Sequence, residues 1–354
     1  MALFPLAGQG LFFGGIIKKM KNFKIWLIFL LLLVLVFVFL FTFKNTERFS
    51  FGDLKTPFVK EETVSILSFG DTMFDRGVRN IIENRGRDPF EYIKKDLSLF
   101  SGYDIIKVNL EGPIVQMDRS LCQQKLYNFQ FASTTPNILK SIGVNMVSIA
   151  NNHSYDCLRA GFESTKNYLS LAGIDFVGAR TLEESYFLKT INNKKLAFVG
   201  IDETTAPVSV SSFYPLVSRL DTENDFVIVF VHWGKEYELI EDISQKNIAY
   251  KLIDNGADLI IGHHPHVIQP VEIYKNKAIF YSLGNFVFDQ NFGDTTKGLG
   301  IGAVLGEKKD TFTLYPLNIK IFAPDLMKDV EREDFCKNYL KNIESEGCTF
   351  EILK

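Results

Sequence analysis

The chain has 354 residues, of which 46% are apolar, 14% are aromatic and 23% are charged, and its net charge is −3. This length allows one large domain or two ordinary ones, with enough buried core to fold without disulfides or metals. The apolar content argues against a mainly disordered chain, and the balance of 39 basic and 42 acidic residues argues against a general nucleic-acid binder. We therefore expect a folded protein with no nucleic-acid partner.

The charge is distributed unevenly along the chain. Residues 1–43 hold four lysines and no acidic residue, so the remainder has a net charge of −7. Residues 25–43 lack charges, Pro and Gly, and as a helix they would be about 28 Å long, close to the thickness of a bilayer core. Because the lysines precede this run, we predict a cytoplasmic N-terminus (1–24), a single transmembrane signal anchor in the lipid bilayer (25–43) and an extracytoplasmic C-terminal domain at the cytoplasmic membrane. Met20 is an alternative initiator.

Residues 44–62 are predicted to be a linker, residues 63–323 a folded domain, and residues 324–354 a C-terminal helical tail. Within the folded domain, short runs rich in Val, Ile or Phe alternate with stretches of helical pattern. The predicted strands are 64–69, 104–109, 144–150, 226–231 and 258–261. The predicted helices are 89–100, 136–142, 160–171 and 243–253. This alternation predicts an α/β layered domain with a largely parallel central sheet.

Three further pairs of apolar runs flank short turns and are predicted to be antiparallel hairpins. They are 187–192 with 195–200, 267–274 with 277–283, and 300–305 with 311–321. The sheets are therefore expected to be mixed, and two of them could be stacked between helices.

Each of the five core strands is followed by polar side chains that can bind ligands, and all five histidines of the chain lie in three of these segments. The segments read GDTM, NLEGP, NNHSYD, HWG and GHHPH, in chain order. Sites in open α/β sheets form at the carboxyl ends of the strands. Carboxylates, an amide and several imidazoles form a set that suits Mn, Zn or Fe better than Ca or Mg. We therefore predict a divalent-metal site with one or two ions.

These segments resemble the calcineurin-like metallophosphoesterase superfamily and, more closely, the CapA (PgsA-type) family of capsule and poly-γ-glutamate biosynthesis proteins. The resemblance covers residues 64–300 and rests on SFGDTMFDRG, VNLEGPI, SIANNHSYD, VFVHWGKEYE, GADLIIGHHPHVIQPVE and IFYSLGNFVFD. It implies a layered α/β/β/α metallophosphoesterase-like fold with mixed central sheets.

The resemblance also implies roles for individual residues. The implied metal ligands are Asp71, Glu111, Asn152, His232, His264 and His266. Glu111 stands where a bridging carboxylate is expected, and His153 matches the proton donor. His263 has no assigned role. Met73 replaces the histidine of the superfamily's Asp-x-His motif, and Asn-Leu-Glu replaces its second motif, so one of two metals could be weak or absent.

Three residues near these motifs are candidates for contacting substrate: Asn109, Arg76 and Asn285. Arg76 could clamp an anionic group. Asn285 follows Gly284 in a segment that equally suits a structural turn.

Three functions stay open at this point. The first is a membrane-anchored, metal-dependent phosphoesterase-type hydrolase in capsule or poly-γ-glutamate synthesis, which acts on an anionic polymer or a phosphorylated substrate. The second is a non-catalytic polymer-binding scaffold that works with other capsule-synthesis proteins, and the third is an extracellular nucleotidase or phosphodiesterase. Cys336 and Cys348 could pair across a short loop in an oxidising compartment, but four free thiols, including Cys122 and Cys157, are equally compatible with the sequence.

Overall fold

A computed structural model of the chain describes residues 62–354 except 117 and 206. The predicted N-terminus, the predicted anchor over 25–43 and nearly all of the predicted linker lie outside the described residues. Among those that are described, the structure contains no helix with the length and apolar character needed to cross a bilayer.

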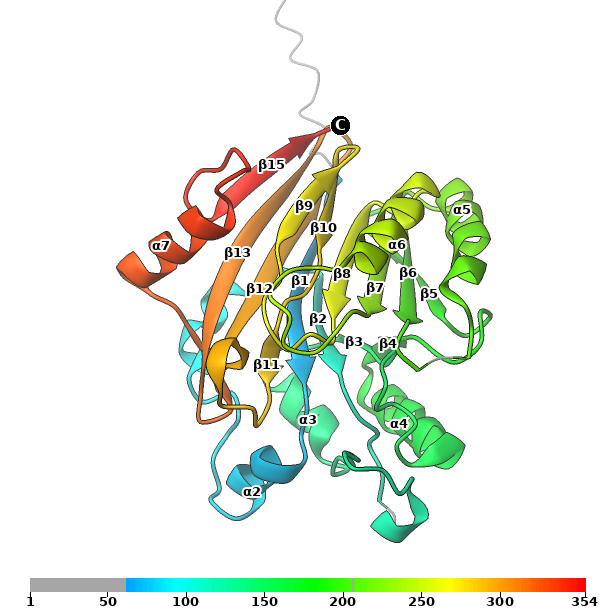
Figure 1. The fold of residues 1–354 in the computed structure, drawn as a ribbon, viewed down its shortest axis with the longest axis vertical. Helices are drawn as coiled ribbons and strands as arrows, with labels where there is room; N and C mark the ends of the chain where they lie inside the picture. The colour runs from blue at the N-terminus through cyan, green and yellow to red at the C-terminus, as the bar shows by residue number, and fades with distance from the viewer. Residues whose placement is uncertain (1–61, 117, 206) are drawn as a thin grey trace, which may run out of the picture. The chain divides into compact units, whose positions relative to one another are not determined.

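The larger sheet has nine strands, in the order β14-β13-β12-β1-β2-β3-β4, with β11 paired to β1 and β15 paired to β13 (Figure 1). Strand β1 runs parallel to β2 and antiparallel to β12, so the sheet is mixed. Its strands are β1 (Val64–Thr72), β2 (Ile105–Leu110), β3 (Met146–Ser148), β4 (Asp175–Val177), β11 (Asn285–Val287), β12 (Lys297–Leu305), β13 (Lys309–Lys320), β14 (Ala323–Leu326) and β15 (Thr349–Leu353).

The smaller sheet has six strands, in the order β5-β6-β7-β8-β10-β9. Its centre is parallel, and the hairpins β5–β6 and β9–β10 make its edges antiparallel, as the turn residues predict. Its strands are β5 (Tyr186–Ile191), β6 (Lys194–Asp202), β7 (Phe226–His232), β8 (Leu259–His263), β9 (Val271–Tyr274) and β10 (Lys277–Phe280).

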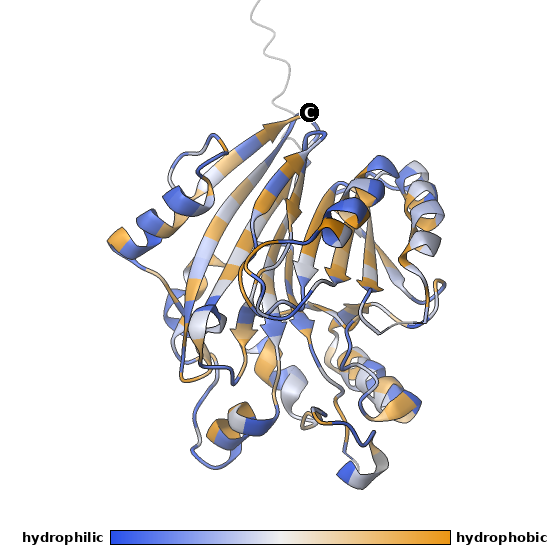
Figure 2. Cartoon of the chain, viewed as in Figure 1, coloured by the Kyte–Doolittle hydropathy of each residue, from blue (hydrophilic) through white to orange (hydrophobic). Residues whose placement is uncertain are grey.

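The two sheets pack face to face, with helices on their outer faces. One buried apolar cluster joins the sheets and contains, for example, Ile66 and Phe312 from the larger and Phe230 and Phe280 from the smaller. Two further clusters lie under the outer helices. The strands are mainly apolar, whereas the helices alternate apolar and polar residues, as expected when helices cover only one side of each sheet (Figure 2). The expected α/β layered architecture with two mixed sheets is therefore confirmed.

The helices are α2 (Arg76–Glu83), α3 (Thr135–Lys140), α4 (Leu158–Ala172), α5 (Phe213–Glu223), α6 (Ile243–Asp254) and α7 (Asp329–Tyr339). Short 3₁₀ segments are η1 (Ile93–Leu99), η2 (Arg119–Leu121), η3 (Val210–Ser212) and η4 (Gly293–Thr296). The clearest sequence signals are at α6, which begins with a capping box formed by Asp242 and Gln245, and at α4, which ends before Gly173 in a left-handed conformation.

Two predicted elements are wrong in their details. The segment 89–100 contains the 3₁₀ turns of η1, with a kink at Asp96, instead of an α-helix. The predicted helical tail over 324–354 contains α7, but β15 also pairs with β13, and Leu340 and Phe350 are buried between the sheets. This segment therefore belongs to the packed domain, because its apolar residues complete the core.

All four cysteines are paired in the structure. Cys122 bonds to Cys157, and Cys336 bonds to Cys348. The first pair links the loop before α3 to the start of α4, and the second links α7 to the loop before β15.

Candidate metal centre

The predicted ligands meet where two sheets place the carboxyl ends of their parallel strands side by side. In the larger sheet, Asp71 at the end of β1 lies opposite Asn109 of β2. In the smaller sheet, His232 at the end of β7 lies opposite His263 of β8. The site is thus assembled from both sheets, with the remaining ligands in the loops that follow β2, β3 and β8.

Asp71 is completely buried and lies at the centre of the cluster. Its Oδ1 accepts a hydrogen bond from Asn109 Nδ2 at 2.8 Å, and its Oδ2 lies 3.3 Å from His266 Nδ1. Burial alone would raise the pKa of Asp71, but hydrogen bonds and charges from His263 and His266 outweigh burial and hold this pKa well below its usual range. Asp71 is therefore a carboxylate at neutral pH.

Glu111 is completely buried, and neither of its carboxylate oxygens has a hydrogen-bond partner in the described part of the chain. Its Oε1 lies 3.7 Å from His266 Nε2 and 4.0 Å from His153 Nε2. Burial, with added repulsion from Asp71, raises the pKa of Glu111 well above its usual value despite the opposing effect of His266. Two unpartnered buried oxygens among imidazoles are what a cation site requires, and ligand atoms of Asp71, Glu111 and His232 lie within 4.8 Å of one another.

A second group of predicted ligands lies beside His232. The Nε2 of His232 is 2.9 Å from Asn152 Oδ1, and the rings of His232 and His264 are 4.7 Å apart between centroids. Burial and the neighbouring histidines lower the pKa of both imidazoles, well below the usual range for His232 and to about 4 for His264. Both rings are therefore neutral at pH 7, the state in which imidazole binds metal.

His266 differs from the other histidines of the cluster. Although burial opposes it, the charge of Glu111 and the hydrogen bond to Asp71 raise the pKa of His266 to about 9. Its Nδ1 also donates to Asn285 Oδ1 at 3.0 Å, which leaves Nε2 directed towards Glu111. His264 and His266 both have positive φ angles, +98° and +59°, an uncommon conformation for residues other than glycine. Backbone strain of this kind is found preferentially at functional sites.

His153, the predicted proton donor, is held from behind by Asp156. Its Nδ1 lies 2.8 Å from Asp156 Oδ2, and its ring packs against Phe129 at 4.0 Å between centroids. Burial lowers the pKa of His153 despite the opposing effect of Asp156. With Nδ1 bound to Asp156, Nε2 is the nitrogen available to exchange a proton on the side of Glu111.

The three residues predicted to contact substrate lie in different settings. Asn109 and Asn285 are completely buried and hold the ligands Asp71 and His266. Arg76 is partly exposed, forms an ion pair with Asp289 and lies 4.8 Å from the centre of the Phe129 ring. It lines a hollow of about 290 Å³ together with Arg119 and Lys125. A role in binding an anionic group remains a prediction for Arg76, and substrate contact remains a prediction for the two asparagines.

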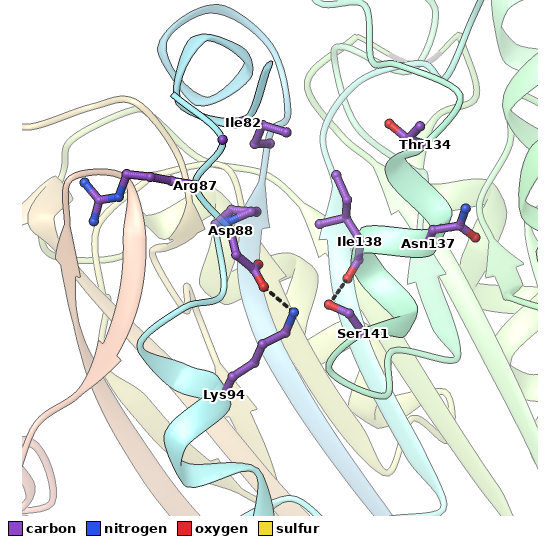
Figure 3. Close-up of a pocket in the computed structure, with 10 residues that line it drawn as sticks. Ile82, Arg87, Asp88, Lys94, Thr134, Asn137, Ile138 and Ser141 are labelled. Carbon is purple, nitrogen blue, oxygen red and sulfur yellow. Dashed lines mark hydrogen bonds and ion pairs between the residues drawn. The ribbon is translucent and has the colours of Figure 1, made fainter. Parts of the chain in front are cut away.

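A larger hollow of about 470 Å³ lies elsewhere, between the segment after α2 and helix α3. Its lining includes Asp88, paired with Lys94, and Ser141, which donates to the carbonyl of Ile138 at 2.7 Å (Figure 3). None of its lining residues is a predicted site residue, and its one acid–base pair is already satisfied. The ligand cluster is therefore the better candidate for chemistry.

Two functional side chains were missed from the sequence. Asp156 ends the segment SIANNHSYD, three residues after His153. A carboxylate so close in sequence to a predicted proton donor is the signal that could have identified it. Lys107 is completely buried in β2, with its Nζ 2.6 Å from His263 Nε2. The signal for Lys107 was a single charge inside the apolar run IIKVN of a predicted buried strand.

Comparison with known proteins identifies the family of the chain. Residues 65–290 match the model of the family described as bacterial capsule synthesis protein PGA_cap. The chain is 31% identical over 265 residues to the PGA biosynthesis protein CapA of Bacillus subtilis (strain 168), which covers 69% of each protein. It is 28% identical over 289 residues to the capsule biosynthesis protein CapA of Bacillus anthracis, covering 75% of this chain and 70% of that protein.

Among solved structures, a hypothetical protein from Thermus thermophilus has 17% identity and a TM-score of 0.43, covering 74% of this chain and 96% of that one. The family assignment rests on the sequence matches, which span the segments that form the ligand cluster and confirm the resemblance found in the sequence. The chain belongs to the bacterial capsule synthesis protein family PGA_cap.

Proposed function

We propose that this chain takes part in synthesis of a bacterial capsule polymer of the poly-γ-glutamate type, and that its ligand cluster is a metal-dependent, phosphoesterase-type hydrolytic site. The similarity to a PGA biosynthesis protein and to a capsule biosynthesis protein, both named CapA, supports the first part. The observation that carries the second part is Glu111, whose two buried and unpartnered oxygens face imidazoles. Leaving a buried carboxylate without a cation or a hydrogen-bond donor is costly.

The donor set centres on Asp71, Glu111 and His232, whose ligand atoms lie within 4.8 Å of one another. Asn152 and His264 lie beside His232, and His266 lies beside Asp71 and Glu111. A divalent ion of the Mn, Zn or Fe type, bound by these residues, supplies a Lewis acid that polarises a phosphoryl or carbonyl oxygen. Asp71, Glu111, Asn152, His232, His264 and His266 are the residues that would hold one ion or two.

The remaining residues place protons and substrate. His153, held at Nδ1 by Asp156, presents Nε2 to the side of the cluster where Glu111 lies, and in its imidazolium form it can donate the Nε2 proton to a leaving oxygen and return to the neutral ring. Arg76, Arg119 and Lys125 line the adjoining hollow, each paired with a carboxylate of this chain (Asp289, Asp75 and Asp156), and an anionic polymer or phosphate would have to compete for these cations. Such local charge matters because the chain beyond residue 43 has a net charge of −7 and would repel a polyanion at long range.

We place this domain outside the cytoplasmic membrane, tethered by residues 25–43 and associated with other polymer-synthesis proteins. The two disulfides support this placement, because such bonds persist in oxidising compartments.

A non-catalytic polymer-binding scaffold is the second candidate, and one observation favours it. Met73 occupies the position where the superfamily motif has a ligating histidine, and its Sδ accepts a hydrogen bond from the amide of Asp75 at 2.9 Å. The sulfur is thus used to shape the loop. A cluster with one imidazole fewer could bind metal without turning over substrate.

The test combines metal analysis with hydrolysis assays on the purified full-length chain. We expect bound Mn, Zn or Fe, and hydrolysis of phosphomonoesters or phosphodiesters that is lost, together with metal, in His264→Ala and Asn152→Ala. The exposed Asn84→Ala is the matched control and should change neither. Absence of metal from the wild type would contradict the proposed metal site. Metal binding without turnover would favour the scaffold.

A further inference from the structure

Lys107 is an unusual residue for the interior of a β-sheet. Its side chain is completely buried, with Nζ 2.6 Å from His263 Nε2 and 4.1 Å from the centre of the Phe230 ring. In the part of the chain that the structure describes, it forms no ion pair with a carboxylate. Burying a lysine in this way costs stability, because the desolvation of its amino group is not offset by a paired charge.

His263 connects Lys107 to the ligand cluster. Its imidazole is also completely buried, and its Nδ1 lies 3.4 Å from Asp71 Oδ1. This Nδ1 makes no hydrogen bond to any described residue, so the Asp71 carboxylate at 3.4 Å is the polar group it faces. Lys107, His263 and Asp71 therefore form a continuous line from β2 through β8 to β1.

The direction of this line follows from hydrogen-bond chemistry. Asp71 is a carboxylate and can only accept, so the ring proton of His263 lies on Nδ1, which faces it, and Nε2 accepts from Lys107 Nζ. The facing oxygen, Asp71 Oδ1, accepts a hydrogen bond from Asn109 Nδ2 at 2.8 Å and lies 3.4 Å from His263 Nδ1. Asn109 from one sheet and His263 from the other thus bound the same oxygen and limit the orientation of the Asp71 carboxylate.

We propose that Lys107 and His263 are positioning residues that act in series to hold Asp71 in its metal-binding orientation. This inference rests on the proposed metal site. His263 is then a support for a ligand and is not itself a ligand, because its Nδ1 carries the proton. Residues that orient metal ligands in this way typically contribute about 10–100-fold to metal affinity.

The first test replaces Lys107 by methionine, which keeps the length of the side chain and removes its donor. We expect Lys107→Met to weaken Mn²⁺ binding about 10–100-fold, while the melting temperature of the metal-free protein stays equal or rises. The control is Lys194→Met, because Lys194 starts β6 at the opposite end from the site and pairs with Glu307 at 2.5 Å. It should leave Mn²⁺ affinity unchanged. A purely structural role for Lys107 would lower the melting temperature and spare the affinity.

The second test replaces His263. It tests the positioning role independently, and therefore also serves if Lys107→Met fails to fold. In His263→Asn, the side-chain amide nitrogen can replace Nδ1 as donor to Asp71, so Mn²⁺ affinity should stay within a few-fold of wild type. His263→Leu removes the donor and should lose about 10–100-fold. In the wild type, ¹⁵N chemical shifts should report the Nδ1–H tautomer of His263, and in Lys107→Met they should report a mixture.

The outcomes separate this inference from the proposed function. If wild type binds Mn²⁺ and Lys107→Met binds it equally well, the positioning role is overturned and the metal site stands. If His263→Asn loses as much affinity as His263→Leu, His263 is a direct ligand and the relay is again overturned. If wild type binds no Mn²⁺, the proposed metal site itself fails.

Discussion

At the scale of single residues, the burial of Glu111 lowers the stability of the metal-free protein, whereas its carboxylate is proposed to bind the metal. Its buried carboxylate has no donor among the described residues and is repelled by Asp71. Burial raises the pKa of Glu111, so its ionisation costs stability in the metal-free protein, and Glu111→Gln, which keeps the shape and cannot ionise, should be at least as stable. The same change should weaken Mn²⁺ binding by over about 100-fold, beyond the usual effect of residues that only support ligands. Thermal melts with and without Mn²⁺ would show both effects.

The control for this experiment is Glu333→Gln on the exposed surface of α7, which should alter neither stability nor metal binding. Unchanged Mn²⁺ affinity in Glu111→Gln would contradict the assignment of Glu111 as a ligand.

We expect His266 to make metal binding depend on pH. Its pKa of about 9 in the metal-free protein means that below pH 9 it must release a proton before it can bind an ion. His232 and His264 have lowered pKa values and do not compete in this range. Mn²⁺ affinity should therefore rise by at least about tenfold per pH unit from pH 7, because Glu111, whose pKa is also raised by burial, must lose its proton as well, and the contribution of His266 should level off above about pH 9. Calorimetry in buffers of different ionisation enthalpy should detect at least one released proton per ion. Affinity independent of pH between 7 and 8.5 would refute this role of His266.

That the predicted ligands would lie close together could be expected from the sequence, because each lies directly at the end of an apolar strand, where the order of strands places it at one edge of a sheet. Asp71, His232 and Glu111 are examples, and the structure brings all three together. The support for these ligands could not be predicted, since Lys107 and His263 come into contact only when two different sheets pack together. Asn285 shows the same limit, because its contact with His266 depends on a loop geometry that local pattern does not encode.

At the scale of elements, the site depends on the close approach of β1 to the loop before β11. A Cβ atom added at Gly70 would lie 1.9 Å from the carbonyl oxygen of Gly284, which accepts a hydrogen bond from the Asp71 amide at 2.9 Å. Gly70→Ala should therefore destabilise the fold by about 1–3 kcal/mol and displace Asp71. We expect a lower melting temperature together with weaker Mn²⁺ binding.

Gly173→Ala is the matched control for this change. Gly173 has φ +68° but open space around its Cβ position, so alanine there costs only backbone strain, about 1 kcal/mol. The Gly173→Ala variant should bind Mn²⁺ with the affinity of the wild type. If Gly70→Ala bound Mn²⁺ normally, the contact between Gly70 and Gly284 would be shown to matter for stability alone.

The elements that the sequence predicted well are those with a single strong pattern. The short apolar runs of β1, β2, β7 and β8 are buried from end to end apart from one position, and their pattern has no competing explanation. The eight-residue α2 was not predicted, since so short a helix has little periodicity. The 89–100 segment shows the opposite error, because a proline and apolar spacing suit both an α-helix and 3₁₀ turns.

At the scale of the whole molecule, the packing of two sheets against each other creates the site. Each sheet alone would carry an incomplete set: Asp71 and Glu111 follow strands of one, and His232, His264 and His266 follow strands of the other. The C-terminal segment contributes to this packing, because β15 extends the larger sheet and Cys336 and Phe350 are buried between the sheets. We infer that disturbing residues 324–354 would also disturb the metal centre, although none of them is a ligand.

The cysteines allow the proposed location to be tested on the intact chain. If the domain lies outside the cytoplasmic membrane, both pairs should form in the cell, so none of the four cysteines should react with a maleimide after rapid denaturation. Prior reduction should expose all four. In Cys336→Ser, Cys348 loses its partner, and a single reactive thiol should appear without reduction, which serves as the control for detection. Four reactive thiols in the unreduced wild type would instead place the domain in a reducing compartment and contradict the proposed orientation of residues 25–43.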